Sequence, residues 1–204
     1  MDSLFGFVGN GYVMMAADAS AARSIIVFKN DHDKILQLDE MKMMGASGTM
    51  ADNEKFGEFI QKNMKLYSLN NDLNLSTSAA ANFMRNELAV ALRKGPFQTN
   101  LLLGGMDKVD ATKEDSEYVP SLYWMDYLAA MTKVNFGSQG HCSNFLLAVF
   151  DREYPVNNPE SLSEEAGIAL VKKCIDVLHT RFLPSQPNFI VKILDKNGMR
   201  TIQL

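Results

Sequence analysis

The chain has 204 residues, of which 47% are apolar and 22% charged, a composition that indicates a folded globular protein and excludes a disordered chain. Twenty basic and 24 acidic residues give a net charge of −4, which argues against nucleic acid as the main partner. Two cysteines, Cys142 and Cys174, are too few for a disulfide framework and fit a reducing compartment.

The chain also lacks the usual signs of membrane insertion and of several domains. No apolar run approaches the roughly 18 residues of a transmembrane helix, and the first residues lack the basic and apolar regions of a secretory signal. The most polar stretch, 107–117, separates two strand-like runs and predicts a solvated hairpin loop. We therefore expect one domain over residues 1–204, with no membrane contact.

The first clear local signal is a β-hairpin at the N-terminus. Apolar runs at 4–8 and 12–17 are joined through Asn10-Gly11, a pair that accepts the positive φ angles of a type I′ turn. Further strand-like runs follow at 24–28, 34–38 and 41–46. The chain thus opens with a block of strands.

A change of apolar period predicts two helices after this block. Apolar residues recur at spacings of three and four across 50–69, and either Thr49 or Asp52 could cap this helix. Ser76 stands at the N-cap position of a second helix, which continues to residue 93.

The second half repeats the pattern of strands followed by helices. Strand-like runs lie at 98–104, 121–127 and 131–135. The apolar run 144–150 could be a strand or a helix, since its periodicity does not decide. Ser163 and the two acids after it begin a helix predicted to reach residue 182, and a last pair of strands flanks the turn 195–198.

Blocks of strands alternating with pairs of helices indicate an α+β fold with antiparallel sheets. Two helix pairs need two apolar surfaces to cover. We therefore expect a layered arrangement, with the helices outside and two sheets inside.

Several motifs occur in a fixed order along nearly the whole chain. They are Gly6–Asp18, Met44-Gly45-Ala46-Ser47-Gly48, Asn100–Gly105, Tyr123–Ala130 and Asp195-Lys196-Asn197-Gly198. Together they resemble the β-type subunits of the 20S proteasome, within the N-terminal-nucleophile hydrolases. The resemblance implies a four-layer αββα sandwich and a place in a seven-membered β ring. The implied partners are neighbouring β-type subunits, the opposite β ring and an α-type ring, and the implied role is ubiquitin-dependent protein degradation in cytoplasm and nucleus.

The resemblance also assigns the positions of a catalytic centre. In active members an N-terminal threonine attacks the peptide, its α-amine is the base, an Asp-paired Lys supplies positive charge, and a glycine amide binds the oxyanion. The matching positions hold Asp18, Lys34 and Gly48, but the nucleophile slot holds Asp2. A carboxylate cannot act as the hydroxyl and should pair with Lys34. Strand alternation turns the next hydroxyl, Ser3, to the opposite face.

Other supporting groups of active members are incomplete as well. The Gly-Ser-Gly-Ser element is replaced by Gly140-His141-Cys142-Ser143, no Asp follows the last long helix near 181–183, and no leader ending in Gly-Thr is expected. We therefore predict a non-catalytic structural subunit. The alternative is an active threonine-type peptidase, and a free-standing binding module fits less well because the resemblance implies an obligate ring.

Simpler interpretations stand beside these. Asp18 and Lys34 could be a structural ion pair rather than catalytic relics, since removing one partner of a buried pair is costly. His32 lies between two aspartates, but the cysteine and histidine spacing gives no metal-binding pattern, so we expect neither metal nor cofactor.

One interface hypothesis concerns the segment after Asp18, which the resemblance places at the substrate groove and at the seam with the next subunit. Small and branched apolar residues there could form a lip that tunes the neighbour's pocket or accepts a small ligand. They are Ala21, Ala22, Ile25 and Val27.

Overall fold

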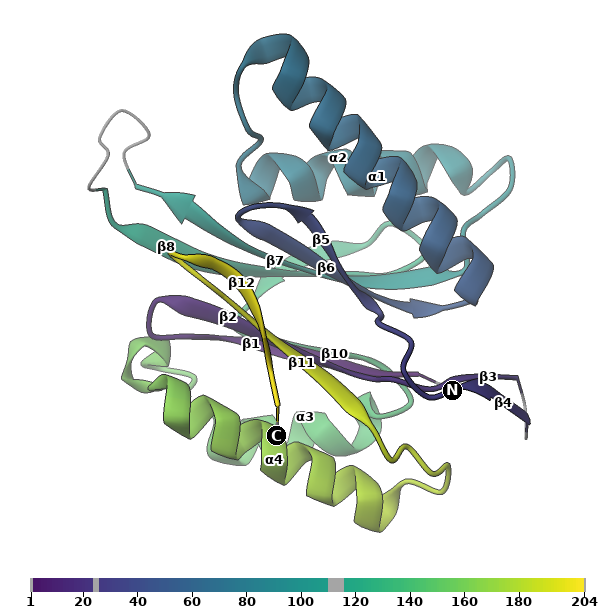
Figure 1. The fold of residues 1–204 in the computed structure, drawn as a ribbon, viewed down its shortest axis with the longest axis vertical. Helices are drawn as coiled ribbons and strands as arrows, with labels where there is room; N and C mark the ends of the chain where they lie inside the picture. Colours follow the sequence, from purple (N-terminus) through teal and green to yellow (C-terminus); the bar gives the residue numbers. More distant parts are fainter. Residues whose placement is uncertain (1, 24–25, 110–115, 204) are drawn as a thin grey trace.

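The computed structural model describes residues 2–23, 26–109 and 116–203. Within these residues, two five-stranded antiparallel sheets lie face to face, and a pair of helices covers the outer side of each sheet (Figure 1). The predicted α+β class and the four-layer αββα sandwich are therefore confirmed.

The first sheet is built around the N-terminal hairpin and has the strand order β10-β1-β2-β11-β12. Its strands are β1 (Ser3–Gly9), β2 (Tyr12–Asp18), β10 (Phe136–Gly140), β11 (Phe189–Asp195) and β12 (Gly198–Ile202). Gly9 pairs with Tyr12, and Gly11 has a φ of 72°, which confirms a tight turn at Asn10-Gly11. The type I′ form is wrong, because it needs a positive φ at both central residues and Asn10 does not have one. The sequence did not indicate β10, which pairs with β1 at the edge of the sheet.

The second sheet has the strand order β5-β6-β7-β8-β9. Its strands are β5 (Ile35–Asp39), β6 (Lys42–Gly48), β7 (Thr99–Lys108), β8 (Tyr118–Met125) and β9 (Met131–Val134). Because β7 continues to Lys108, the first two residues of the predicted loop 107–117 belong to the strand, and residues 110–115 lie outside the described part.

Along the chain, a two-stranded ribbon comes between the N-terminal hairpin and the first strand of the second sheet. It consists of β3 (Ala21–Arg23) and β4 (Ile26–Lys29). The single strand expected over 24–28 is thus only partly tested, because residues 24 and 25 lie outside the described part.

The helices begin where the sequence suggested, with one exception in the capping. They are α1 (Met50–Asn71), α2 (Thr77–Ala91), α3 (Ser143–Glu153) and α4 (Glu164–Arg181), with a 3₁₀ turn, η1 (Pro159–Ser161), before α4. The Oγ atoms of Ser76 and Ser163 each accept a hydrogen bond from the backbone amide three residues later, as N-cap side chains do. Thr49 occupies the N-cap of α1 without a side-chain bond, while Asp52 instead accepts from the Gln98 amide. The undecided run 144–150 is helical and forms most of α3.

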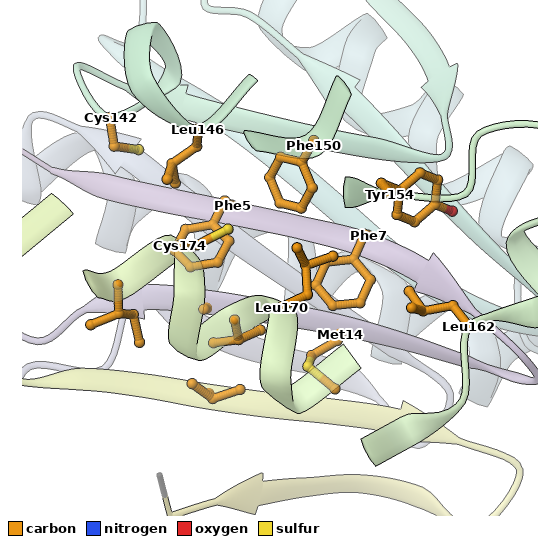
Figure 2. Close-up of a cluster of buried hydrophobic side chains, with 14 of the residues drawn as sticks. Phe5, Phe7, Met14, Cys142, Leu146, Phe150, Tyr154, Leu162, Leu170 and Cys174 are labelled. Carbon is orange, nitrogen blue, oxygen red and sulfur yellow. The ribbon is translucent and has the colours of Figure 1, made fainter. Parts of the chain in front are cut away.

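β1 and β2 are buried along their whole length, because one face packs on helices and the other on the second sheet. On the helix side, Phe5 and Phe7 contact Phe150 of α3 (Figure 2). On the other side, Leu4 and Met15 join the cluster between the two sheets.

The space between the sheets is filled by long side chains lying over glycines. A Cβ on Gly45 would collide with Leu4 and Met15, and a Cβ on Gly104 would collide with Val13. The glycines thus let the two sheets approach closely. This close packing fixes the start of β1 against the start of β5 and the end of β6, where the candidate site lies.

No helix in the described part of the chain is long and apolar enough to cross a membrane.

Candidate functional site

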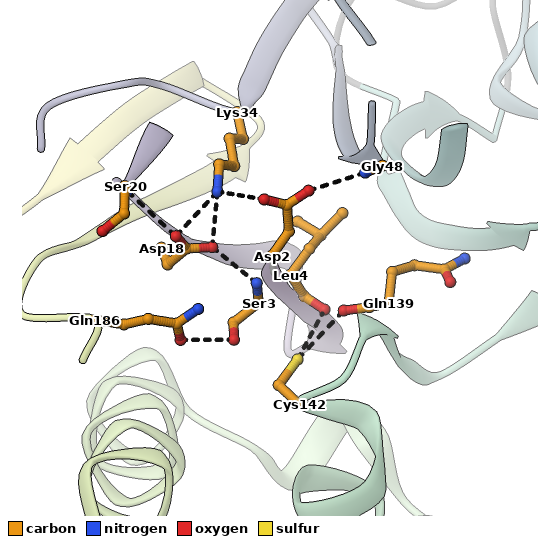
Figure 3. Close-up of polar contacts among 10 residues, drawn as sticks. All are labelled: Asp2, Ser3, Leu4, Asp18, Ser20, Lys34, Gly48, Gln139, Cys142 and Gln186. Carbon is orange, nitrogen blue, oxygen red and sulfur yellow. Dashed lines mark hydrogen bonds and ion pairs between the residues drawn. The ribbon is translucent and has the colours of Figure 1, made fainter. Parts of the chain in front are cut away.

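The four residues assigned by resemblance meet at one end of the two sheets (Figure 3). The antiparallel pairing of β1 with β2 sets Leu4 opposite Ala17, which brings Asp18 next to the start of β1. Pairing of β5 with β6 brings the segment before Ile35 close to the end of β6, since the Ala46 amide donates to the carbonyl of Lys34. Strand register thus forms each half of the site within its own sheet, and the packing of the two sheets brings the halves together.

Lys34 is the centre of the site. Its Nζ lies 2.9 Å from each carboxylate oxygen of Asp18 and 2.8 Å from Oδ1 of Asp2. The side chain of Lys34 is only 5% exposed and that of Asp18 is fully buried. The ammonium therefore bridges two carboxylates in a poorly solvated place, and the expected pairing of Asp2 with Lys34 is present.

Asp18 is held by backbone donors as well as by Lys34. The Ser3 amide donates to Oδ1 at 2.7 Å, and the Ser20 amide donates to Oδ2 at 3.2 Å. Burial raises the pKa of Asp18 above its usual value, while the Lys34 ammonium and the Ser3 amide act in the opposite direction. The removal of either partner would leave a buried charge without its main counter-charge, which is costly in a structural ion pair.

Asp2 spans the gap between Lys34 and Gly48. Its Oδ2 accepts a hydrogen bond from the Gly48 amide at 2.9 Å, while its Oδ1 binds Lys34. Gly48 has a φ of 150°, and a Cβ there would collide with the carbonyl of Gln98, so this position requires glycine. Both the cation and the amide that the resemblance assigns to catalysis are thus already bound to a carboxylate of the chain.

The hydroxyl that follows Asp2 faces away from this group, as strand alternation predicted. Ser3 is fully buried, and its Oγ donates to Oε1 of Gln186 at 2.7 Å. No sequence pattern pointed to Gln186, which lies in the loop between α4 and β11. Ser143, the remaining serine of the altered Gly-Ser-Gly-Ser element, donates to the carbonyl of Gly140 at 2.7 Å.

The His32 region has a structural arrangement of its own. Among the residues that the structure describes, no group of three or more histidine, cysteine, aspartate or glutamate side chains could hold a metal ion. Asp33, beside His32, accepts from the Ile35 amide at 2.9 Å and pairs with Lys192 of β11. These contacts tie the entry of β5 to the other sheet.

The segment proposed as an apolar lip is divided between a buried and an exposed part. Ala21 is buried, whereas Val27 on the facing strand is 52% exposed and its neighbour Phe28 is 67% exposed. Ala22 is exposed and pairs with Val27, and Ile25 lies outside the described residues. The exposed apolar surface of the ribbon therefore belongs to β4 more than to the alanines.

With this geometry established, comparison with known proteins gives the family. A family model described as "Proteasome subunit" matches residues 2–194. The chain belongs to the proteasome subunit family. Its relatives include proteasome subunit beta type-2-B of Arabidopsis thaliana, which is 46% identical over 98% of this chain and 94% of the relative.

Two further relatives narrow the group to β-type subunits. Proteasome subunit beta type-2 of Dictyostelium discoideum is 42% identical over 99% of this chain and 97% of its own length. Proteasome subunit beta type-4 of Saccharomyces cerevisiae is 34% identical over 99% of this chain and 97% of its own length. The resemblance to β-type proteasome subunits is thus confirmed, and the layered fold is the N-terminal-nucleophile hydrolase sandwich that it implied.

Proposed function

We propose that this β-type subunit is a non-catalytic, structural member of the 20S proteasome core. One observation carries the proposal: the Asp2 carboxylate is bound between the Lys34 ammonium and the Gly48 amide, where the family mechanism needs a hydroxyl nucleophile. Whatever precedes residue 2 in the chain, this position offers no alcohol.

The same contacts oppose the alternative, an active threonine-type peptidase. Acyl transfer needs amide donors free to bind the oxyanion that forms in the transition state. The Gly48 amide is already donating to Asp2, and Lys34 is already shared between two carboxylates. A peptide carbonyl would have to displace Asp2 before it met either group.

As a proteasome subunit, the chain assembles with other proteasome subunits. The proposal places it beside β-type neighbours in a seven-membered ring, stacked between the opposite β ring and an α-type ring. It would there support degradation of ubiquitin-tagged proteins in cytoplasm and nucleus, supplying wall and contacts rather than chemistry.

The β3–β4 ribbon is the part that we propose for contact with an adjacent subunit. Contacts within the chain leave Val27 and Phe28 largely exposed, which favours burial against a partner. Ala21 and Ala22 of β3 pair with this strand and would support its apolar surface, while Ile25, the remaining residue of the hypothesis, lies outside the described residues.

A labelling experiment on the assembled particle tests the non-catalytic role. The particle is purified with this subunit in place, treated with an electrophilic inhibitor that modifies N-terminal threonines, and analysed subunit by subunit by mass spectrometry. We expect labelled catalytic neighbours and an unmodified Asp2 chain. A covalent adduct at residue 2 or 3 of this chain would overturn the proposal.

The ribbon is tested separately by Val27→Ser in the assembled particle. We expect slower peptide turnover by the adjacent subunit or reduced incorporation of the variant. Leu183→Ser serves as the control, because Leu183 is also apolar, is 97% exposed and lies outside the ribbon. Equal effects of the two variants would remove the ribbon from the proposal.

A further inference from the structure

The two groups that bind Asp2 are held in place by contacts that do not involve Asp2. Lys34 Nζ is fixed by both oxygens of the buried Asp18, at 2.9 Å each. Gly48 is fixed by its pairing with Thr99 of β7, and the next amide, that of Thr49, donates to the carbonyl of Gln98 at 2.8 Å. A cation and an amide donor therefore face one another across a gap whether or not residue 2 carries a carboxylate.

We propose that Lys34 and Gly48 form a carboxylate-binding site, and that Asp2 is its tethered ligand. The two oxygens of Asp2 divide between the donors, with Oδ1 at 2.8 Å from Lys34 Nζ and Oδ2 at 2.9 Å from the Gly48 amide (Figure 3). Charge-assisted bonds of this length are among the stronger hydrogen bonds in proteins. Because the Asp2 side chain is 16% exposed, the gap that it fills borders solvent.

Tethering explains how a modest site stays filled. Asp18 already balances the charge of Lys34, so a free carboxylate gains only a shared cation and one amide donor. Asp2 is supplied by the chain itself at an effective concentration of about millimolar or more, without the entropy cost of a separate molecule. The native subunit therefore keeps its site closed to external carboxylates, including the C-termini of peptides. This inference rests on the proposed function in one respect, that residue 2 acts as an occupant and not as a nucleophile.

The test removes the tethered ligand and offers a free one. Particles carrying Asp2→Gly are compared with wild type by hydrogen exchange of the Gly48 amide, once in chloride and once in about 100 mM formate at equal ionic strength. We expect exchange at Gly48 to rise at least about tenfold in the variant in chloride, which corresponds to the loss of a hydrogen bond of about 1.4 kcal/mol. Formate should return most of the protection, and it should leave the wild type unchanged.

Two controls identify the site as the place where formate acts. In Asp2→Gly combined with Lys34→Met, formate should no longer protect Gly48, because the cation is gone. Asp126→Gly is the matched control: Asp126 also accepts from backbone amides, those of Leu128 and Ala130, but no ion pair to it is present among the described residues. In Asp126→Gly, formate should not restore protection to the amides of Leu128 and Ala130.

A Gly48 amide that stays protected in Asp2→Gly, or an exposed amide that formate leaves exposed, would show that no carboxylate site exists. Should Asp2→Gly not assemble, Asp2→Ala is measured in the same way, since it keeps a strand-compatible backbone while removing the carboxylate. The inhibitor labelling described above does not depend on formate, so failure of this inference and failure of the non-catalytic role are told apart.

Discussion

Replacing Lys34 with methionine is the most informative perturbation of the buried charge cluster. Methionine keeps the length and the apolar stem of the side chain but removes the ammonium, which leaves the fully buried Asp18 carboxylate with the Ser3 and Ser20 amides as its remaining donors. Breaking a buried ion pair from one side costs about 3–5 kcal/mol of unfolding free energy. With an m-value of about 2 kcal/mol/M, the urea midpoint should fall by about 2 M.

The loss should also depend on pH in a defined direction. Burial raises the pKa of Asp18, and the Lys34 ammonium opposes that rise, so the variant has a still higher pKa. A carboxyl with a higher pKa in the folded chain favours folding below its unfolded pKa, and this contribution is lost as pH rises through the folded pKa. Lys34→Met should therefore be less destabilised at pH 5 than at pH 7.5.

The assay is urea unfolding of the recombinant chain, followed by the fluorescence of Trp124, its single tryptophan. The double variant Lys34→Met with Asp18→Asn serves as the control, because it removes the stranded charge and should recover part of the loss. A cost below about 1 kcal/mol, or an equal cost at both pH values, would refute the reasoning, since it would place the pair among weak surface interactions.

Three further predictions concern the two buried cysteines, the N-cap of α4 and the crowding at Gly48. Burial raises the pKa of Cys142 and raises that of Cys174 to about 12, so a thiol reagent at pH 8 should modify neither in the native chain and both in urea; rapid native labelling would contradict their burial. Ser163→Ala removes the N-cap of α4 and should cost about 1 kcal/mol in urea unfolding, whereas an unchanged midpoint would show that the cap bond contributes nothing. Gly48→Ala should cost at least about 2 kcal/mol because its Cβ meets the Gln98 carbonyl, and a variant as stable as wild type would disprove that crowding.

Local chemistry in the sequence predicted the turns and helix starts well. Gly11 adopts the positive φ that its turn requires, and Ser76 and Ser163 make the capping bonds expected of them. These features depend on a residue and its near neighbours, which is why the sequence alone reveals them. By contrast, β10 carries two glycines in five residues and has weak strand propensity, and it becomes a strand through pairing with β1.

The site was predictable only where the family resemblance supplied positions. Asp18, Lys34 and Gly48 come together as expected, and Asp2 binds the last two. The Gln186 partner of Ser3 was not foreseen, because the contact joins positions 183 residues apart. Contacts of this kind are set by how sheets and loops pack in space, and neither periodicity nor motif spacing encodes them.

The methionines between the sheets give the molecule a particular weakness. Met15, Met43 and Met106 are all buried in the layer where glycines bring the two sheets together. Oxidation would convert an apolar thioether into a polar sulfoxide. Peroxide that reached this layer would therefore separate the two sheets, and the subunit would lose its shape before any other property.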